Sequence, residues 1–202
     1  MPTAGIVTQT KANQLYLDGW LGQYSLGVST TLVNAQVTGE IFQFRWVDAT
    51  RVAAITKLQV VIAPSASQTT LDILQLDLIK ATGWSGQGTG VVSVDMTAGT
   101  NKRRTSMPTS LVQAGDIRYS GTPLGAGTKS LEANSLASVL VIGVTGPQLP
   151  PTRMIEYRQG DGDYPLVLAT NEGFVLKIIQ NTVAGNGVQV AITVDWIETA
   201  QS

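Results

Sequence analysis

The sequence predicts an all-β protein that folds as an antiparallel sandwich or barrel. Apolar and polar residues alternate in about nine or ten short segments, as they do in half-buried strands. Turn signals separate these segments about every 10 to 15 residues, and no segment has the pattern of a long helix. At 202 residues the chain is long enough to bury a full core, and no linker divides it. We therefore expect one β-sandwich domain over residues 41–202, preceded by an N-terminal extension over residues 1–40.

The clearest strand pattern runs from Gly173 to Glu198. Its second half places apolar residues at every other position, namely Val188, Val190, Ile192, Val194 and Trp196. Its first half alternates in the same way from Phe174, and the connector over residues 181–187 supplies glycine and asparagine, which suit turns. This pattern predicts an antiparallel hairpin whose register is set by its buried face.

Two more strands are predicted between residues 41 and 62. The segment from Ile41 to Val47 places three aromatic side chains on one face, those of Phe42, Phe44 and Trp46. The following run keeps five apolar residues in one phase until Pro64 ends it: Val52, Ala54, Leu58, Val60 and Ile62. We expect both segments to pack against a core.

The segment over residues 71–81 fits two structures. Its leucines alternate as in a strand, but Leu71, Leu74 and Leu78 also fit a helix that Thr70 could cap. We favour a strand because the neighbouring segments on both sides are β. Further short strands are predicted at residues 91–94, 116–120, 136–144, 154–158 and 166–169.

Residues 1–40 are open to two interpretations. Leu15, Tyr16 and Trp20 lie close together, but Gly19 and Gly22 interrupt any long helix. The segment is either an arm that docks its aromatic residues on a neighbouring subunit, or a first strand or short helix that covers the protein's own core.

Composition limits the chemistry and points to a surface with little charge. The chain has no cysteine and no histidine, which removes disulfides, thiolate metal sites and the commonest general base. Its net charge is -1, so no overall field favours nucleic acid or an anionic membrane. Charged residues make up 13% of the chain, against about 25% in soluble domains. We infer that other subunits cover much of the surface; the alternative is a neutral secreted β-domain.

No motif predicts a catalytic, cofactor-binding or metal-binding site. The glycine-rich stretch at residues 82–90 lacks the lysine and hydroxyl residue of a P-loop at the required positions, so we expect a flexible loop between strands. Asp161 and Asp163 lack the other ligands of a calcium loop, and the basic cluster at residues 100–105 fits a solvated loop or an acidic or phosphate contact. Paired carboxylates remain possible in principle. We expect no enzyme, no specific nucleic acid, no membrane span and no signal peptide.

Four stretches in order resemble a family of small structural proteins of tailed-bacteriophage virions. They are RWVDATRVAAITKLQV (Arg45 to Val60), NKRRTSM (Asn101 to Met107), DIRYSGTPLGAGTKSLEANSL (Asp116 to Leu136), and PLVLATNEGFVL with the closing ITVDWIE (Pro165 to Glu198). The first 40 residues lie outside the resemblance. The segment LDILQLDLIKA departs from the basic, aromatic strand usual there.

The resemblance implies a jelly-roll β-sandwich in a phage virion assembled in the host cytoplasm. It implies a capsid decoration or cement protein, a homo-oligomer for which we favour a trimer, with the major capsid protein or other virion proteins as partners. The N-terminal arm would bridge neighbours by strand addition. Alternatives are a neck, collar or tail protein, or a receptor- or glycan-binding module whose stacking platforms are Trp20, Trp84 or Tyr164. Trp84 is the best candidate of the three, and the other interpretation of it is a buried loop anchor.

Overall fold

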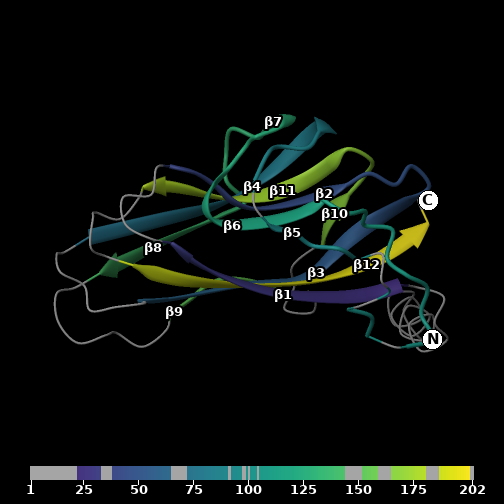
Figure 1. Cartoon of the computed structure of the whole chain (residues 1–202), viewed down its shortest axis with the longest axis horizontal. Coiled ribbons are helices and arrows are strands. Elements are labelled where there is room, and N and C mark those ends of the chain that lie inside the picture. Colours follow the sequence, from purple (N-terminus) through teal and green to yellow (C-terminus); the bar gives the residue numbers. More distant parts are fainter. Residues whose placement is uncertain are drawn as a thin grey trace, which may run out of the picture.

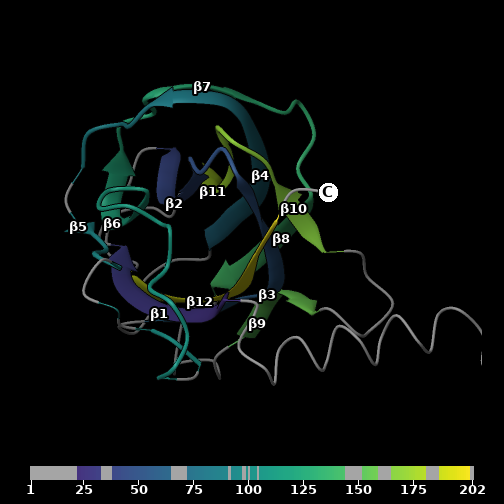
Figure 2. The same cartoon turned by 90° about the vertical axis from the view of Figure 1, so that its right-hand side faces the viewer.

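The computed structural model describes residues 22–32, 38–64, 72–90, 92–96, 99, 101–103, 105–143, 152–158, 165–180 and 187–200. This part of the chain contains twelve strands and no helix. The strands form two antiparallel sheets that lie face to face (Figures 1 and 2). The all-β sandwich predicted from the sequence is therefore confirmed.

The first sheet has five strands. In spatial order they are β1 (Gly22–Leu32), β12 (Val188–Ala200) and β3 (Arg51–Pro64), with β10 (Leu166–Leu168) and β9 (Thr152–Arg158) beside β3. β10 pairs with residues 53–55 of β3 and β9 with residues 57–62, so the two short strands follow one another along the same side of β3.

The second sheet has seven strands. In spatial order they are β5 (Val92–Ser93), β6 (Ile117–Leu124), β2 (Gly39–Trp46), β11 (Glu172–Gln180) and β4 (Asp72–Gly86), with β7 (Thr128–Leu131) and β8 (Ala137–Gly143) beside β4. The ambiguous segment at residues 71–81 is thus confirmed as a strand over its described part. β4 also takes in the first half of the glycine-rich stretch that was expected to be a loop.

The predicted C-terminal hairpin is wrong, although both of its strands exist. β11 pairs with β2 and β4 in the seven-stranded sheet, whereas β12 pairs with β1 and β3 in the other sheet. The chain therefore crosses the sandwich between these strands. Each strand is central in its sheet and has two partners, which satisfies the backbone on both sides without mutual pairing.

An aromatic cluster joins the two sheets through the core. Phe44 of β2 stacks on Phe174 of β11 at 5.3 Å between ring centroids and meets the edge of Trp196 of β12 at 5.4 Å. Tyr24 of β1 stacks on the other side of Trp196 at 5.6 Å. All four side chains are fully buried. The aromatic face predicted for residues 42–46 therefore lies in the core, as expected.

A β-bulge in β3 changes which residues face the core. Lys57 pairs with Asp195 and Ile55 pairs with Trp196, so Thr56 is the extra residue, and its hydroxyl donates to the carbonyl of Asp195 at 3.2 Å. Beyond the bulge the expected residues Leu58, Val60 and Ile62 are buried. Before it the phase is reversed: Ala53 and Ile55 are buried, and the expected Val52 and Ala54 are only half-buried. A single regular phase across the bulge was the error in the prediction.

The boundary expected at residue 40 is corrected by β1. Residues 22–32 pair with β12 along eleven consecutive positions, and Tyr24, Leu26 and Leu32 are buried in the core. β2 already begins at Gly39. The described part of the N-terminal segment is therefore the first strand of the sandwich, which was the second of the two interpretations. The arm expected over residues 1–21 lies outside the described residues.

Candidate functional site

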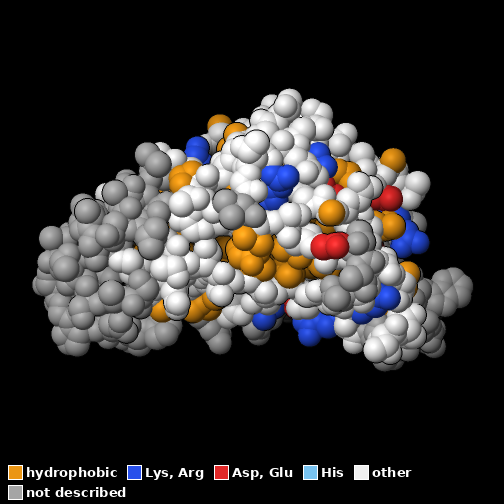
Figure 3. Space-filling model, in the orientation of Figure 1, with side chains coloured by type: hydrophobic (Ala, Val, Ile, Leu, Met, Phe, Trp, Pro, Cys, Tyr) orange, Lys and Arg blue, Asp and Glu red, His pale blue; other side chains and the backbone are white. Residues whose placement is uncertain are grey.

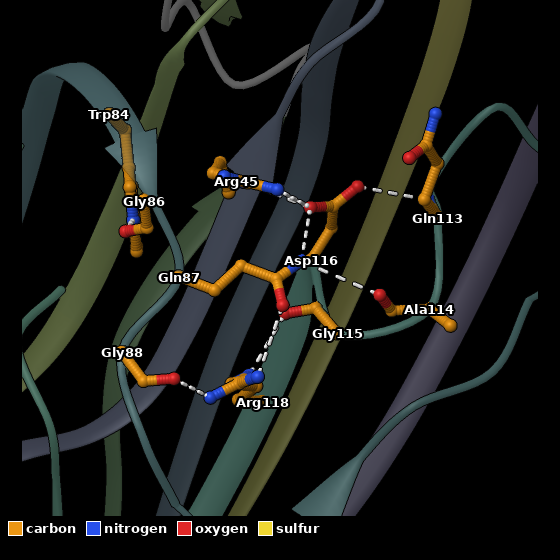
Figure 4. A network of polar contacts seen from close by, with 10 residues as sticks. All are labelled: Arg45, Trp84, Gly86, Gln87, Gly88, Gln113, Ala114, Gly115, Asp116 and Arg118. Atoms are coloured by element: carbon orange, nitrogen blue, oxygen red, sulfur yellow. Dashed lines mark hydrogen bonds and ion pairs between the residues drawn. The ribbon is translucent and has the colours of Figure 1, made fainter. Parts of the chain in front are cut away.

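Asp116 is the centre of a buried polar network next to β2 (Figure 4). It immediately precedes β6, and its carboxylate accepts hydrogen bonds from Nε and Nη2 of Arg45, at 2.9 and 2.6 Å. The backbone amide of Gln113 and the side-chain amide of Gln87 also donate to it, at 3.0 and 3.2 Å. Its side chain is fully buried and that of Arg45 nearly so. This network fastens the loop before β6 to the middle of the sheet.

Arg118 extends the same network toward residues 87–90. Its guanidinium donates to the carbonyl oxygens of Gly88 and Gly115 and to the side-chain oxygen of Gln87 (Figure 4). The glycine-rich stretch is therefore held by a cation from a neighbouring strand. Because the carbonyl oxygen of Gly88 accepts from Arg118, this part of the stretch presents an acceptor to its neighbour and not the amide groups that a phosphate needs.

A second buried network contains an ion pair. The ammonium of Lys129 lies 2.8 Å from Oε2 of Glu40, and the two side chains are 2% and 6% exposed. Gln43 donates to the same carboxylate oxygen at 2.6 Å, and the ammonium sits 4.2 Å from the ring centroid of Trp84. Burial lowers the pKa of Lys129, and Glu40 opposes that shift. This pair ties β7 to β2 across the outer surface of the seven-stranded sheet.

A third network surrounds Glu198 near the end of β12. The carboxylate accepts hydrogen bonds from the hydroxyl of Ser110 at 2.5 Å, the amide of Leu111 at 3.1 Å and the indole of Trp196 at 3.1 Å. Burial raises the pKa of Glu198, against the effect of these donors and of Arg51. Burial also raises the pKa of Tyr24, and the charge of Glu198 adds to that shift. Glu198 therefore anchors the loop around Ser110 to the five-stranded sheet.

The basic cluster at residues 100–105 contacts the protein's own surface. Arg103 lies 2.7 Å from Oδ2 of Asp195, which also accepts a hydrogen bond from Ser25 at 2.5 Å. Main-chain hydrogen bonds join Ser25 to Asn101 and Arg103 to Gln23, each at 3.0 Å. The sequence allowed a solvated loop, an acidic contact or a phosphate contact for this cluster. The structure shows an acidic contact for Arg103, and the acidic residue, Asp195, belongs to the same chain. Arg104 lies outside the described residues.

These networks are formed by partners within the chain. The buried carboxylates of Glu40, Asp116, Asp195 and Glu198 each accept hydrogen bonds from side chains or amides that hold a loop or a strand in place. In the described ranges, no three acidic residues are grouped so that they could bind a metal ion. These hydrogen bonds and ion pairs therefore hold loops and strands of the sandwich in fixed positions. These carboxylates could not be singled out from the sequence, because side-chain partners such as Arg45 for Asp116 and Ser110 for Glu198 are 71 and 88 residues away along the chain.

Apolar side chains gather at two places on the surface. Figure 3 shows an apolar patch in the middle of one face, over the region where β1 lies beside β5 and β6. Leu136 and Leu140, at the margin of the seven-stranded sheet, are 49% and 60% exposed. Exposed large apolar residues are common singly, but grouped ones indicate a contact surface.

Trp84 is not the exposed stacking platform proposed for a glycan-binding module. Its side chain is 1% exposed and packs in a small cluster with Ile79, Ala81 and Val175 on the outer side of the sheet. The indole donates to the carbonyl of Gly86 at 3.1 Å. The alternative of a buried anchor is right about its burial, but Trp84 lies in strand β4 and not in a loop. Trp20, Tyr164, Asp161 and Asp163 lie outside the described residues.

The sequence matches no protein-family model and no curated protein. In the part of the chain with described coordinates, no helix is long and apolar enough to cross a membrane.

Proposed function

We propose that this chain is a structural subunit of a tailed-phage virion, and that it acts as a capsid decoration or cement protein. The observation that carries the proposal is the exposure of Leu136 and Leu140 at a sheet margin. The buried carboxylates of Glu40 and Glu198 are meanwhile hydrogen-bonded within the chain. A rigid sandwich with apolar residues on its surface suits burial against other subunits, and the low charged fraction of 13% agrees with that use.

The strand order supports the jelly-roll part of the proposal. In the five-stranded sheet the last strand, β12, lies between β1 and β3; in the other sheet β11 lies between β2 and β4. Two C-terminal strands are thus each inserted between two N-terminal ones. Such interleaving is what two Greek keys produce when they fold into the double sheet of a jelly roll, an architecture used by viral capsid proteins.

Quantitative mass spectrometry of purified particles tests the proposal. A decoration or cement protein is expected in hundreds of copies per particle, at a fixed ratio to the major capsid protein. Particles that lack the chain are expected to lose their contents at a lower temperature and to recover when the purified chain is added back. Absence of the chain from purified particles would refute the assignment.

A neck, collar or tail protein is the second candidate. The same sandwich and exposed residues serve that role, and the copy number distinguishes it, because a tail or neck protein is present in tens of copies or fewer. The glycan-binding module is less well supported, since its best candidate platform, Trp84, is buried.

A further inference from the structure

The margins of the two sheets differ in how they are protected from pairing with another chain. An edge strand offers a row of unpaired amide and carbonyl groups, and proteins usually blunt it with charges, proline, short length or a covering segment. β5, β7 and β10 have two, four and three residues, and Pro165 directly precedes β10. β9 contains Arg153, Glu156 and Arg158. At the start of β1, Ser25 donates a main-chain hydrogen bond to Asn101 and Gln23 accepts one from Arg103.

Among the described residues, β8 is not protected by its own sequence, and apart from β4 its described neighbour is β9 of the other sheet, which contacts it without pairing. β8 has seven residues, Ala-Ser-Val-Leu-Val-Ile-Gly, with no charge and no proline. It pairs with β4 over residues 72–78, and no other described strand pairs with it. It lies at the margin of the seven-stranded sheet, on the side of β4 away from β11. A strand of this length and composition at an edge is the usual template for strand addition.

The side chains of β8 are arranged so that an added strand would cover an exposed apolar residue on the outer surface of the sheet. Val139 and Val141 pack against the core, while Leu140 is opposite Gln75 of β4 and is 60% exposed. Leu136, next to the start of β8, is 49% exposed. An added strand would therefore gain main-chain hydrogen bonds along its length and cover Leu140, which is large, apolar and the most exposed residue of its kind in the described chain.

We propose that the partner of β8 is β8 of a second copy of this chain, joined antiparallel about a two-fold axis so that two seven-stranded sheets become continuous. Leu140 is the midpoint of residues 137–143, so full overlap places Leu140 opposite Leu140. The strand has no charge, so self-pairing brings no like charges together. A two-fold contact of this kind is self-complementary. The inference rests on the proposed structural role, and it identifies the edge of β8 as one surface through which copies of the chain would assemble.

Two lysine variants test the contact by sedimentation velocity over a range of concentrations. L140K places two ammonium groups opposite each other, and its dimer dissociation constant is expected to rise by on the order of tenfold or more. I179K is the matched control: Ile179 is exposed on β11, which has partners on both sides, so dimerisation is expected to be unchanged. If the chain also forms trimers through another contact, the β8 contact would join two trimers into a hexamer. L140K should then convert the hexamer to a trimer, and I179K should leave the hexamer intact. Far-ultraviolet circular dichroism checks that both variants fold.

Cysteine cross-linking tests the register, because the natural chain contains no cysteine. L140C is expected to form a covalent dimer under mild oxidation, since directly opposed residues bring their Cβ atoms within about 4.5–5.5 Å, and I179C is expected not to. If the protein forms an oligomer but L140C does not cross-link, the contact lies on another surface. The same follows if I179K disrupts the oligomer as strongly as L140K does. Neither result would contradict the proposed role in the virion. A monomer at every concentration would overturn the β8 contact itself, while particle copy number would still decide the proposed function.

Discussion

Arg45 donates two hydrogen bonds to one carboxylate oxygen of Asp116, although the two residues are 71 positions apart. The Asp116 side chain is fully buried and that of Arg45 is 11% exposed. The pair joins the C-terminal end of β2 to the loop before β6. Its value to the fold depends on both partners being present, because either charge alone would be buried without a counterion.

Asp116→Ala is expected to lower the free energy of unfolding by about 3–5 kcal/mol, because it leaves the Arg45 guanidinium and the Gln113 amide without their acceptor. Chemical denaturation with guanidinium chloride measures the change. The matched control is Arg103→Gln, which removes the ion pair with Asp195. Since the Arg103 side chain is 49% exposed, that change should cost no more than about 1 kcal/mol. Equal losses in the two variants would contradict the assigned role of the buried network.

Gly173→Ala is expected to destabilise the sandwich by about 1–3 kcal/mol or more through overpacking. A Cβ atom at this position would overlap the carbonyl oxygen of Phe44 and lie 2.9 Å from the ring of Trp84, and neither is free to move away. Gly27→Ala in β1 is the control, because nothing lies within 4 Å of its added Cβ. Thermal unfolding should show a lower midpoint for Gly173→Ala and no decrease for Gly27→Ala.

Lys129→Met is expected to cost about 3–5 kcal/mol, because Glu40 would remain buried without its counterion. Adding Glu40→Gln to the same chain should recover much of that loss, since the neutral amide no longer needs a cation. A double-mutant cycle from denaturation curves measures the coupling between the two sites. Additive effects would show that the two residues do not depend on each other for stability.

The fold class could be predicted because it depends on local alternation. Phe42, Phe44 and Trp46, and likewise Val190, Ile192 and Val194, are buried in the phase that the sequence indicates. The partners of a strand are less accessible: β11 and β12 have the pattern of a hairpin but lie in different sheets. Period-two alternation shows which side of a strand is buried, and it contains no information about which strand lies beside it.

The polar networks could not be predicted from the sequence for a related reason. Asp116 precedes a strand and Glu198 lies in one, which are ordinary positions for acidic residues. Only the tertiary fold brings Arg45 and Ser110 to them. Trp84 shows the reverse case: its glycine-rich neighbourhood suggested an exposed loop, but the strand continues to Gly86 and buries the indole.

Glu198 makes the stability of the sandwich depend on pH in a direction that its burial fixes. Burial raises the pKa of this carboxyl in the folded protein above its value in the unfolded chain, despite three hydrogen-bond donors and Arg51. Between the two pKa values the folded state binds more protons than the unfolded state. The contribution of Glu198 to stability is therefore fully present below the ordinary glutamate pKa of about 4.3 and is lost as the pH rises through the folded value.

Glu198→Gln is expected to remove this dependence. The amide oxygen can still accept hydrogen bonds from Ser110 and Trp196, and the side chain no longer ionises. The measurement is the free energy of unfolding at a series of pH values from about 4 upward. The difference between the natural chain and the variant should shift in favour of the variant as the pH rises. A difference that stays constant, or that shifts toward the natural chain, would show that the carboxylate is stabilised by Arg51 and its donors more than it is penalised by burial.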